Sequence, residues 1–391
     1  MNQPLFLHIV ERLEGFLHRL PATIQKPILQ ELTPLKQLFL QQRPPRFVLT
    51  GSHRVAVQEV VATVFAAAQP GDLSNVLMEV FRWHDVDVGG HGTIALLDAR
   101  GADDAALQNI EQELTRSSAD IFLHLVDGNS SRPVLSRDTE TLAKLHALNA
   151  DSKIIGISLL GATRTTKTEA TDRPSAQAKL QATLSEKPNL RDHVLQAIEL
   201  PLSGTGSSSD SGAAARLMSL LANELPNEAR VEMIRISRDR QAQVQIAQVL
   251  VKSTSAICTA IGAQPIPLAD LPILTTLQLV MVSGIMYIAG RERSLRASTE
   301  FVGALGVNVG AGMVLREGAR AVLKFFPGWG NVVCGMVAGA GTYALGRAAI
   351  VYFLEGVSLK EARRTYLSSR KKPRAVKRLI GGNATSHASG S

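Results

Sequence analysis

Few side chains in this 391-residue sequence have the type and spacing that chemistry requires. Ser52 and His53 are adjacent, but no nucleophile elbow surrounds them, so hydrolase chemistry of that kind is not expected. Metal-ligand residue types also gather around a glycine-rich turn, as His84, Asp85, Asp87 and His91. Histidines and acids on a hairpin are more often solvated, and these spacings define no second shell, so the sequence does not predict a metal centre.

The segments around these residues alternate between strand and helix patterns. Apolar runs predict strands at residues 47–50, 76–81, 93–97, 121–126, 154–159 and 194–200. Helical periodicity predicts helices at residues 55–68, 104–116, 138–148 and 212–224, whereas residues 163–185 are expected to be a polar insertion. Strands alternating with helices of this length indicate a doubly wound, mostly parallel sheet. We therefore expect an α/β domain over residues 43–225.

The order of elements and loops resembles the Era-like branch of bacterial P-loop GTPases. In that family the first strand leads into a phosphate loop, GxxxxGK[ST], whose amides and lysine hold phosphates and whose hydroxyl binds magnesium. The corresponding loop here is Gly51, Ser52, His53, Arg54, Val55, Ala56, Val57 and Gln58. Ala56, Val57 and Gln58 stand where the family has glycine, lysine and serine or threonine. The resemblance therefore implies a P-loop GTPase-like fold with a degenerate phosphate loop.

Later landmarks of the family are partly kept. Asp98 and Gly101 match its DxxG, in which the aspartate binds magnesium through water and the glycine senses the γ-phosphate. The guanine-reading NKxD is absent, because residues 159–163 read LLGAT. Ser203 begins an SGTG stretch at the place of the family's guanine loop. The resemblance implies vestigial nucleotide-binding residues, with GTP and Mg²⁺ left open as ligands: Gly51, Ser52, His53, Arg54, Gln58, Asp98, Gly101 and Ser203.

A second and more specific resemblance begins after residue 230. A helical pattern runs to about residue 261, and PIPLAD (265–270), FPGWG (326–330) and GTYALG (341–346) follow. Together these motifs resemble the apolar helical domain of unknown function, YcjF-type, that is appended to many bacterial Era-like GTPases. Over residues 226–368 the resemblance implies an all-α partner domain for a G domain, often associated with a membrane, and no chemistry.

The apolar stretches of this domain raise the question of a bilayer span. Residues 271–290 carry no charge, and small residues such as Gly335 and Gly339 let helices approach closely. Six basic residues between 291 and 324 conflict with a simple two-pass hairpin. A peripheral or re-entrant bundle is preferred, then a two-span hairpin, then a soluble bundle. Contact with a membrane or partner helix is expected through Leu279, Met281, Ile285 and Tyr287.

The net charge of +8 is concentrated near the C-terminus. Residues 360–378 hold nine basic residues against Glu361, so the rest of the chain is neutral. Such a segment is attracted to anionic lipid, although a solvated, frayed terminus has the same composition. Its one aromatic residue is Tyr366 and it has no reading motif, so nucleic acid is not expected. The expected basic contacts are Arg363, Arg364, Arg370, Lys371, Lys372 and Arg374, the last four in a basic, disordered tail at 369–391.

The two ends of the chain complete the domain plan. Residues 1–42 have the apolar spacing of two amphipathic helices, expected to form a packing arm or to bind a partner. Their start lacks a basic n-region, so no signal peptide is expected. Cys258 and Cys334 lie in apolar surroundings, which is typical of buried thiols in a reducing cytosol. The expected location is the cytoplasmic face of a membrane, which the resemblance identifies as the bacterial inner membrane.

Three functions follow from these patterns. The preferred one is a membrane-associated pseudo-GTPase, a scaffold or regulatory partner of another GTPase or helical protein with little or no GTP hydrolysis. The second is a GTP-binding hydrolase in which Arg54 replaces the missing lysine, because a guanidinium can clamp phosphate. The third is a structural membrane-binding helical protein.

Overall fold

Buried apolar runs form the strands of one sheet in the computed structural model, which describes residues 25, 26, 29, 41–65, 81–88, 92–130, 134–161, 175–202, 211–263, 270–305 and 330–370. The strands are β1 (Arg46–Gly51), β2 (His84–Asp87), β3 (Thr93–Asp98), β4 (Ile121–Asp127), β5 (Lys153–Leu160) and β6 (Val194–Pro201). They form a six-stranded sheet in the order β2-β3-β1-β4-β5-β6. Only the β2–β3 pair of this sheet is antiparallel. The predicted doubly wound, mostly parallel sheet is confirmed.

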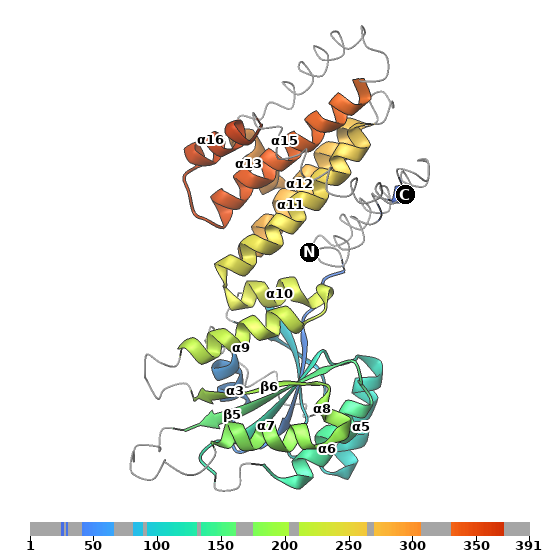
Figure 1. Ribbon diagram of the computed structural model, residues 1–391, viewed down its shortest axis with the longest axis vertical. Coiled ribbons are helices and arrows are strands. Elements are labelled where there is room, and N and C mark those ends of the chain that lie inside the picture. Colours follow the sequence, from blue (N-terminus) through green and yellow to red (C-terminus); the bar gives the residue numbers. More distant parts are fainter. Residues whose placement is uncertain are drawn as a thin grey trace, which may run out of the picture. The chain divides into compact units, whose positions relative to one another are not determined.

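Helices cover both faces of the sheet (Figure 1). They are α3 (Val57–Val64), α5 (Asp104–Arg116), α6 (Ser136–Ala147), α7 (Ala176–Glu186), α8 (Pro188–Arg191), α9 (Ser211–Glu224) and α10 (Asn227–Ser237). On one face α5 to α8 bury leucines and isoleucines against alternate strand residues such as Val48 and Phe122. The predicted helix at 104–116 is confirmed to the residue, with the Asp103 carboxylate capping α5 by accepting from the Ala106 amide.

Two parts of the predicted α/β domain differ from the structure. The strand predicted at 76–81 lies outside the described residues apart from Phe81, which is in a turn, and β2 begins at His84 instead. The end of the predicted polar insertion is wrong, since α7 occupies it with Leu180 and Leu184 fully buried. The two leucines, four residues apart, pack this helix against β5 and β6, and the side chains of Gln177 and Gln181 hydrogen-bond the Ala197 backbone on β6.

The chain divides into two units after α10, one spanning Gln42–Arg238 and the other containing the residues from Asp239 onward. α10 belongs with the sheet because the buried Glu232 carboxylate accepts a 2.9 Å hydrogen bond from the Thr93 amide at the start of β3. Gly92 leaves room for this contact, since a Cβ there would lie 2.7 Å from Glu232 Oε1. The structural boundary is therefore 13 residues beyond Leu225, the end of the domain expected from the sequence.

The second unit is a helical bundle, as the sequence predicted. It contains α11 (Arg240–Gly262), α12 (Asp270–Ile288), α13 (Leu295–Ala304), α15 (Gly330–Phe353) and α16 (Leu359–Arg370). α11, α12 and α15 pack on one another, α13 packs on α12, and α16 packs on α15. Within the bundle Gln278 donates a 2.9 Å hydrogen bond to the Thr342 hydroxyl, and the Cys258 thiol is free, with its pKa raised to about 12 by burial.

Glycines let α15 approach α11 closely. A Cβ at Gly335 would lie 2.6 Å from the Thr259 carbonyl oxygen, and one at Gly339 would collide with the Thr259 hydroxyl. Gly346 lies against Val251 in the same way, seven residues further along the helix. The small residues that the sequence analysis singled out at 335 and 339 thus form a helix–helix contact inside the bundle.

Candidate functional site

The sheet topology places a switch point between the loops that follow β1 and β3, and the region between these two loops is the candidate crevice of the fold. β1 and β3 are neighbours and parallel, yet the loop after β1 leads to α3 on one face and the loop after β3 leads to α5 on the other. Ligands of doubly wound folds bind at such switch points, beside the carboxyl ends of the strands. The loop at residues 51–56 and the loop at 98–103 both lie there, so the fold brings together the two motifs predicted from the sequence.

The loop after β1 is seated tightly on β4. Gly51 has φ +90°, and a Cβ at this position would collide with the Leu125 carbonyl, so only glycine fits. The Ser52 amide then donates a 2.8 Å hydrogen bond to the same carbonyl. Under the loop, the buried Thr50 hydroxyl pairs with His124 Nδ1 at 3.0 Å. The path of this loop is therefore fixed by contacts within the protein.

Arg100 occupies the space between the two loops. Its Nε and Nη2 atoms each donate a 2.8 Å hydrogen bond to one oxygen of the Asp98 carboxylate. Its Nη1 atom donates to the carbonyl oxygens of Val55, at 2.9 Å, and Ser52, at 3.4 Å. The Arg100 side chain is 4% exposed, so this guanidinium is buried and fully engaged. Sequence analysis missed its role because the partners on the first loop lie more than 40 residues earlier.

These contacts reverse the polarity that phosphate binding requires. A phosphate loop directs backbone amides at its ligand, whereas here the Ser52 and Val55 carbonyls are directed at a cation. The start of α3 adds no positive charge, since its N-cap Ala56 makes no side-chain hydrogen bond, its first residue is Val57, and the charged residue of its first turn is the acid Glu59. Gln58 lies half-buried in the first turn. The crevice is arranged to hold its own arginine.

The other charged side chains near the two loops are more exposed than Arg100. Arg54, 69% exposed, reaches Asp127 at the end of β4 through a 3.1 Å ion pair. The exposed His53 ring lies 3.4 Å from where a Cβ of Gly101 would be, and Gly101 has φ +69°. Burial raises the pKa of the Asp138 carboxyl on α6, while the nearby His53 acts in the opposite direction. Asp127 and Asp138 were not predicted, because nothing in the sequence marks them as neighbours of the loop.

Two buried polar groups beneath the crevice lack hydrogen-bond partners among the described residues. They are His124 Nε2 and the Ser158 hydroxyl, on the adjacent strands β4 and β5. Burial lowers the pKa of His124 to about 4, so the ring is neutral near pH 7. A neutral imidazole under Gly51 offers no positive charge to an anion in the loop.

Other predicted site residues have different outcomes. Ser203, His91, Lys371, Lys372 and Arg374 lie outside the described residues. His84, Asp85 and Asp87 belong to β2, and the described part of the chain contains no group of three metal-ligand residues. On α16, Arg363 and Arg364 are exposed; Arg370 ends the helix.

The apolar residues expected to contact a membrane or partner lie on α12. Met281 and Ile285 are fully buried within the helical bundle, whereas Leu279 and Tyr287 are partly exposed. Among the described helices, only α11 is long and apolar enough to cross a bilayer, and 56% of its apolar window is buried inside the protein. Such burial is equally typical of a core helix in a soluble bundle, and contact of α12 with a membrane stays a prediction.

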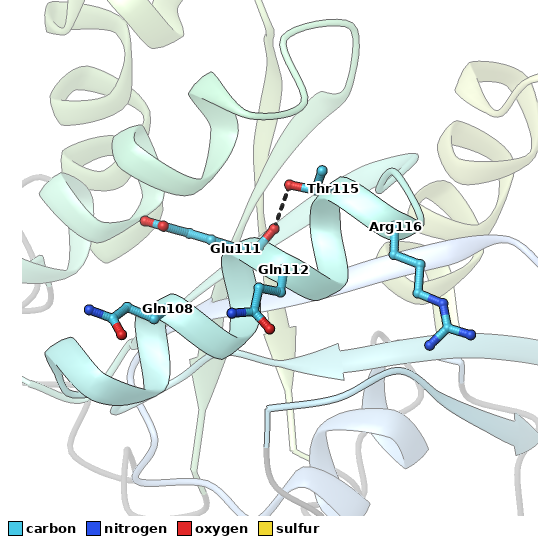
Figure 2. Close-up of a pocket in the computed structure, with 5 residues that line it drawn as sticks. All are labelled: Gln108, Glu111, Gln112, Thr115 and Arg116. Carbon is cyan, nitrogen blue, oxygen red and sulfur yellow. Dashed lines mark hydrogen bonds between the residues drawn. The ribbon is translucent and has the colours of Figure 1, made fainter.

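A hollow of about 560 Å³ lies apart from the crevice, on the outer face of α5 (Figure 2). Its described lining consists of polar side chains along one side of that helix: Gln108, Glu111, Gln112, Thr115 and Arg116. Figure 2 shows these side chains extending from the helix without converging on a common point. The described side chains that line this hollow form no arrangement typical of a catalytic or metal site.

No protein-family model matches the chain, and no curated protein matches it.

Proposed function

We propose that this protein is a pseudo-GTPase, a GTPase-derived module that acts as a scaffold or regulatory partner and hydrolyses little or no GTP. The observation that supports this most strongly is the Arg100 guanidinium bound to Asp98 and to the loop carbonyls. The strand order, with an antiparallel edge strand on a parallel sheet, is compatible with a GTPase ancestry. The assignment to the GTPase family within this proposal rests on the two sequence resemblances.

Hydrolysis of GTP needs electrostatic stabilisation of the phosphates by a lysine and a magnesium ion. Val57 holds the lysine position, and both oxygens of Asp98 already accept hydrogen bonds from Arg100. A magnesium-bound water would have to separate a bidentate pair whose guanidinium is buried, and this separation leaves the buried Arg100 charge without its carboxylate. The crevice therefore favours an internally satisfied state over a nucleotide complex.

A nucleotide measurement on the full chain tests this proposal. Calorimetry with GTP and Mg²⁺ should give no heat of specific binding, and phosphate release should equal that of a buffer blank. Asp98→Ala should leave both results unchanged. Robust turnover that Asp98→Ala abolishes would contradict the proposal.

A second candidate, a hydrolase with an unconventional phosphate loop, is favoured by one observation. Arg54 is an exposed cation within the loop, and its exposed ion pair with Asp127 is weak enough to exchange for a phosphate. Binding of GTP or ATP that Arg54→Ala removes and Arg54→Lys partly restores would support this candidate. Absence of binding in the wild-type protein would exclude it.

For location and partners, we propose the cytoplasmic face of a membrane, by resemblance the bacterial inner membrane, and a second GTPase or helical protein as the partner. The support is the apolar bundle and the excess of basic residues from Lys360 onward. Fractionation with carbonate extraction tests the mode of attachment. Release into the supernatant would support the peripheral form and exclude a two-span hairpin.

A further inference from the structure

The one acidic residue of α16 is used in capping the helix. Glu361 Oε2 accepts hydrogen bonds from the Ser358 amide, at 3.4 Å, and from the Ser358 hydroxyl, at 3.3 Å. The Glu361 amide donates back to the Ser358 hydroxyl at 3.3 Å, which completes a capping box. The carboxylate is therefore held at the first turn and does not extend along the helix toward its basic residues.

One side of α16 is buried in the bundle. Ala362 is completely buried and Tyr366 is 7% exposed, where the helix packs on α15. The two residues are four positions apart and lie on one face. Tyr366 is the aromatic residue of the basic segment, so its ring is unavailable for stacking on a nucleic acid base.

The opposite side is an exposed basic stripe. Lys360, Arg363, Arg364 and Leu367 follow the i, i+3, i+4, i+7 spacing of a single helix face, and all four are exposed. The three cations make no ion pair with any described residue. Leu367 is 47% exposed among them, so the stripe combines three cations with one apolar side chain.

We propose that this basic stripe of α16 is a docking surface for an anionic lipid bilayer, with the cations at the headgroups and Leu367 at the acyl boundary. Charge complementarity identifies the occupant, because unpaired cations around an apolar residue on one helix face are what an interfacial helix requires. The sequence continues with Arg370, Lys371 and Lys372, which extends the same charge. The inference rests on the proposed membrane association and deepens it by naming the surface.

Vesicle flotation with the full chain tests the stripe. We expect binding to vesicles with 30% phosphatidylglycerol and none to phosphatidylcholine alone. The triple variant Lys360→Gln, Arg363→Gln, Arg364→Gln should bind the anionic vesicles about 100-fold more weakly. A matched control removes three exposed cations elsewhere in the unit, through Arg240→Gln, Lys252→Gln and Arg296→Gln, and should change binding less than about threefold.

Salt separates the two contributions within the stripe. At 1 M salt the attraction between the three cations and the anionic headgroups is screened, so wild type and the triple variant should bind vesicles with the same affinity. Leu367→Ser should weaken binding about three- to tenfold at low salt and should still weaken the residual binding at high salt, because burial of apolar area is not screened. These substitutions are on an exposed face, and far-UV circular dichroism confirms the fold.

The outcomes distinguish this inference from the proposed function. Wild-type binding that neither the triple variant nor Leu367→Ser weakens would overturn the stripe and leave membrane association in place. Failure of the wild-type chain to bind anionic vesicles would overturn both, whereas nucleotide measurements are independent of α16. Tighter, stripe-dependent binding of a 20-nucleotide RNA than of vesicles, measured by anisotropy, would also overturn the lipid assignment.

Discussion

Arg100 shows at the scale of a single residue how a motif can be present in the sequence while its aspartate is bound to another side chain of the protein. In the sequence, Asp98 and Gly101 match a DxxG motif. Nothing in the sequence indicates that Arg100, which lies between them, is hydrogen-bonded to both loops. The positions of the candidate residues were predictable, because strands carry their motifs to the carboxyl edge of a sheet. The internal ion pair was not, because it depends on how two distant loops meet.

The Arg100 contacts predict a large stability difference between two arginines of the same site. Arg100→Ala should lower the free energy of unfolding by about 3 kcal/mol, because it leaves the Asp98 carboxylate and two carbonyls without their donor. Arg54→Ala should cost at most about 0.5 kcal/mol, since its ion pair with Asp127 is exposed. Urea denaturation monitored by circular dichroism measures both. Equal losses of stability in the two variants would contradict the burial of the Arg100 guanidinium between the two loops.

Burial of His124 predicts a loss of stability in acid. Its pKa is about 4 in the folded chain and about 6.5 when unfolded, so the unfolded state binds more protons between these values. The contribution of His124 to the free energy of unfolding is therefore fully present above pH 6.5. It decreases by about 3 kcal/mol as the pH is lowered to 4. Burial also lowers the pKa of His146, which acts in the same direction.

A variant isolates the contribution of His124. His124→Asn keeps an atom near Nδ1 for Thr50 but cannot titrate. Denaturation at pH 7.5 and at pH 4 should show that the stability gap between wild type and this variant narrows by about 3 kcal/mol in acid. A gap independent of pH would show that His124 does not remain neutral in the folded state.

At the scale of elements, buried strands and long amphipathic helices were predictable from the sequence and edge elements were not. β4 and β5 are continuous apolar runs because both of their faces are covered by helices. β2 is an edge strand with the sequence HDVD, in which only Val86 is buried, so it lacks the apolar signal. Its histidine and aspartates look like candidate ligands in the sequence, yet they belong to a half-exposed strand.

The contact between α11 and α15 predicts opposite effects for two glycines of one helix. Gly339→Ala should destabilise the bundle by about 2 kcal/mol, because its methyl group would collide with Thr259. Gly341→Ala should stabilise it by about 0.5 to 1 kcal/mol, since nothing lies within 4 Å and alanine is the better helix former. Thermal denaturation of the two variants compares them directly. The same sign for both would contradict the packing of α15.

At the scale of the whole molecule, the chain consists of two units, each with its own core. The buried contact of Glu232 with Thr93 places α10 with the sheet. A sequence pattern could not predict this, because the residues of α10 after 230 and those of α11 read as one helical pattern that runs to about residue 261. The buried Glu232 carboxylate and the glycine that makes room for it mark α10 as part of the first unit.

This boundary predicts that residues 42–238 fold without the bundle. The fragment should give one cooperative unfolding transition, followed by the fluorescence of Trp83, whose indole donates to the Glu113 carbonyl. Glu232→Ala within the fragment should cost about 2 kcal/mol, because the Thr93 amide loses its acceptor. A fragment ending at residue 225 should be less stable than one ending at 238. Equal stability of the two would show that α10 is not part of this unit.

The close contact of Gly51 with β4 has an evolutionary consequence. Its positive φ and its closeness to the Leu125 carbonyl make this glycine necessary for folding whether or not a ligand is present. Selection for stability alone can therefore keep a glycine at this position, so its presence is not by itself evidence for a bound phosphate. Glycine, lysine and threonine introduced at positions 56–58 would still leave the Arg100 guanidinium hydrogen-bonded to Asp98 and to the Val55 carbonyl. Those three substitutions alone would therefore not free the Asp98 carboxylate for a ligand.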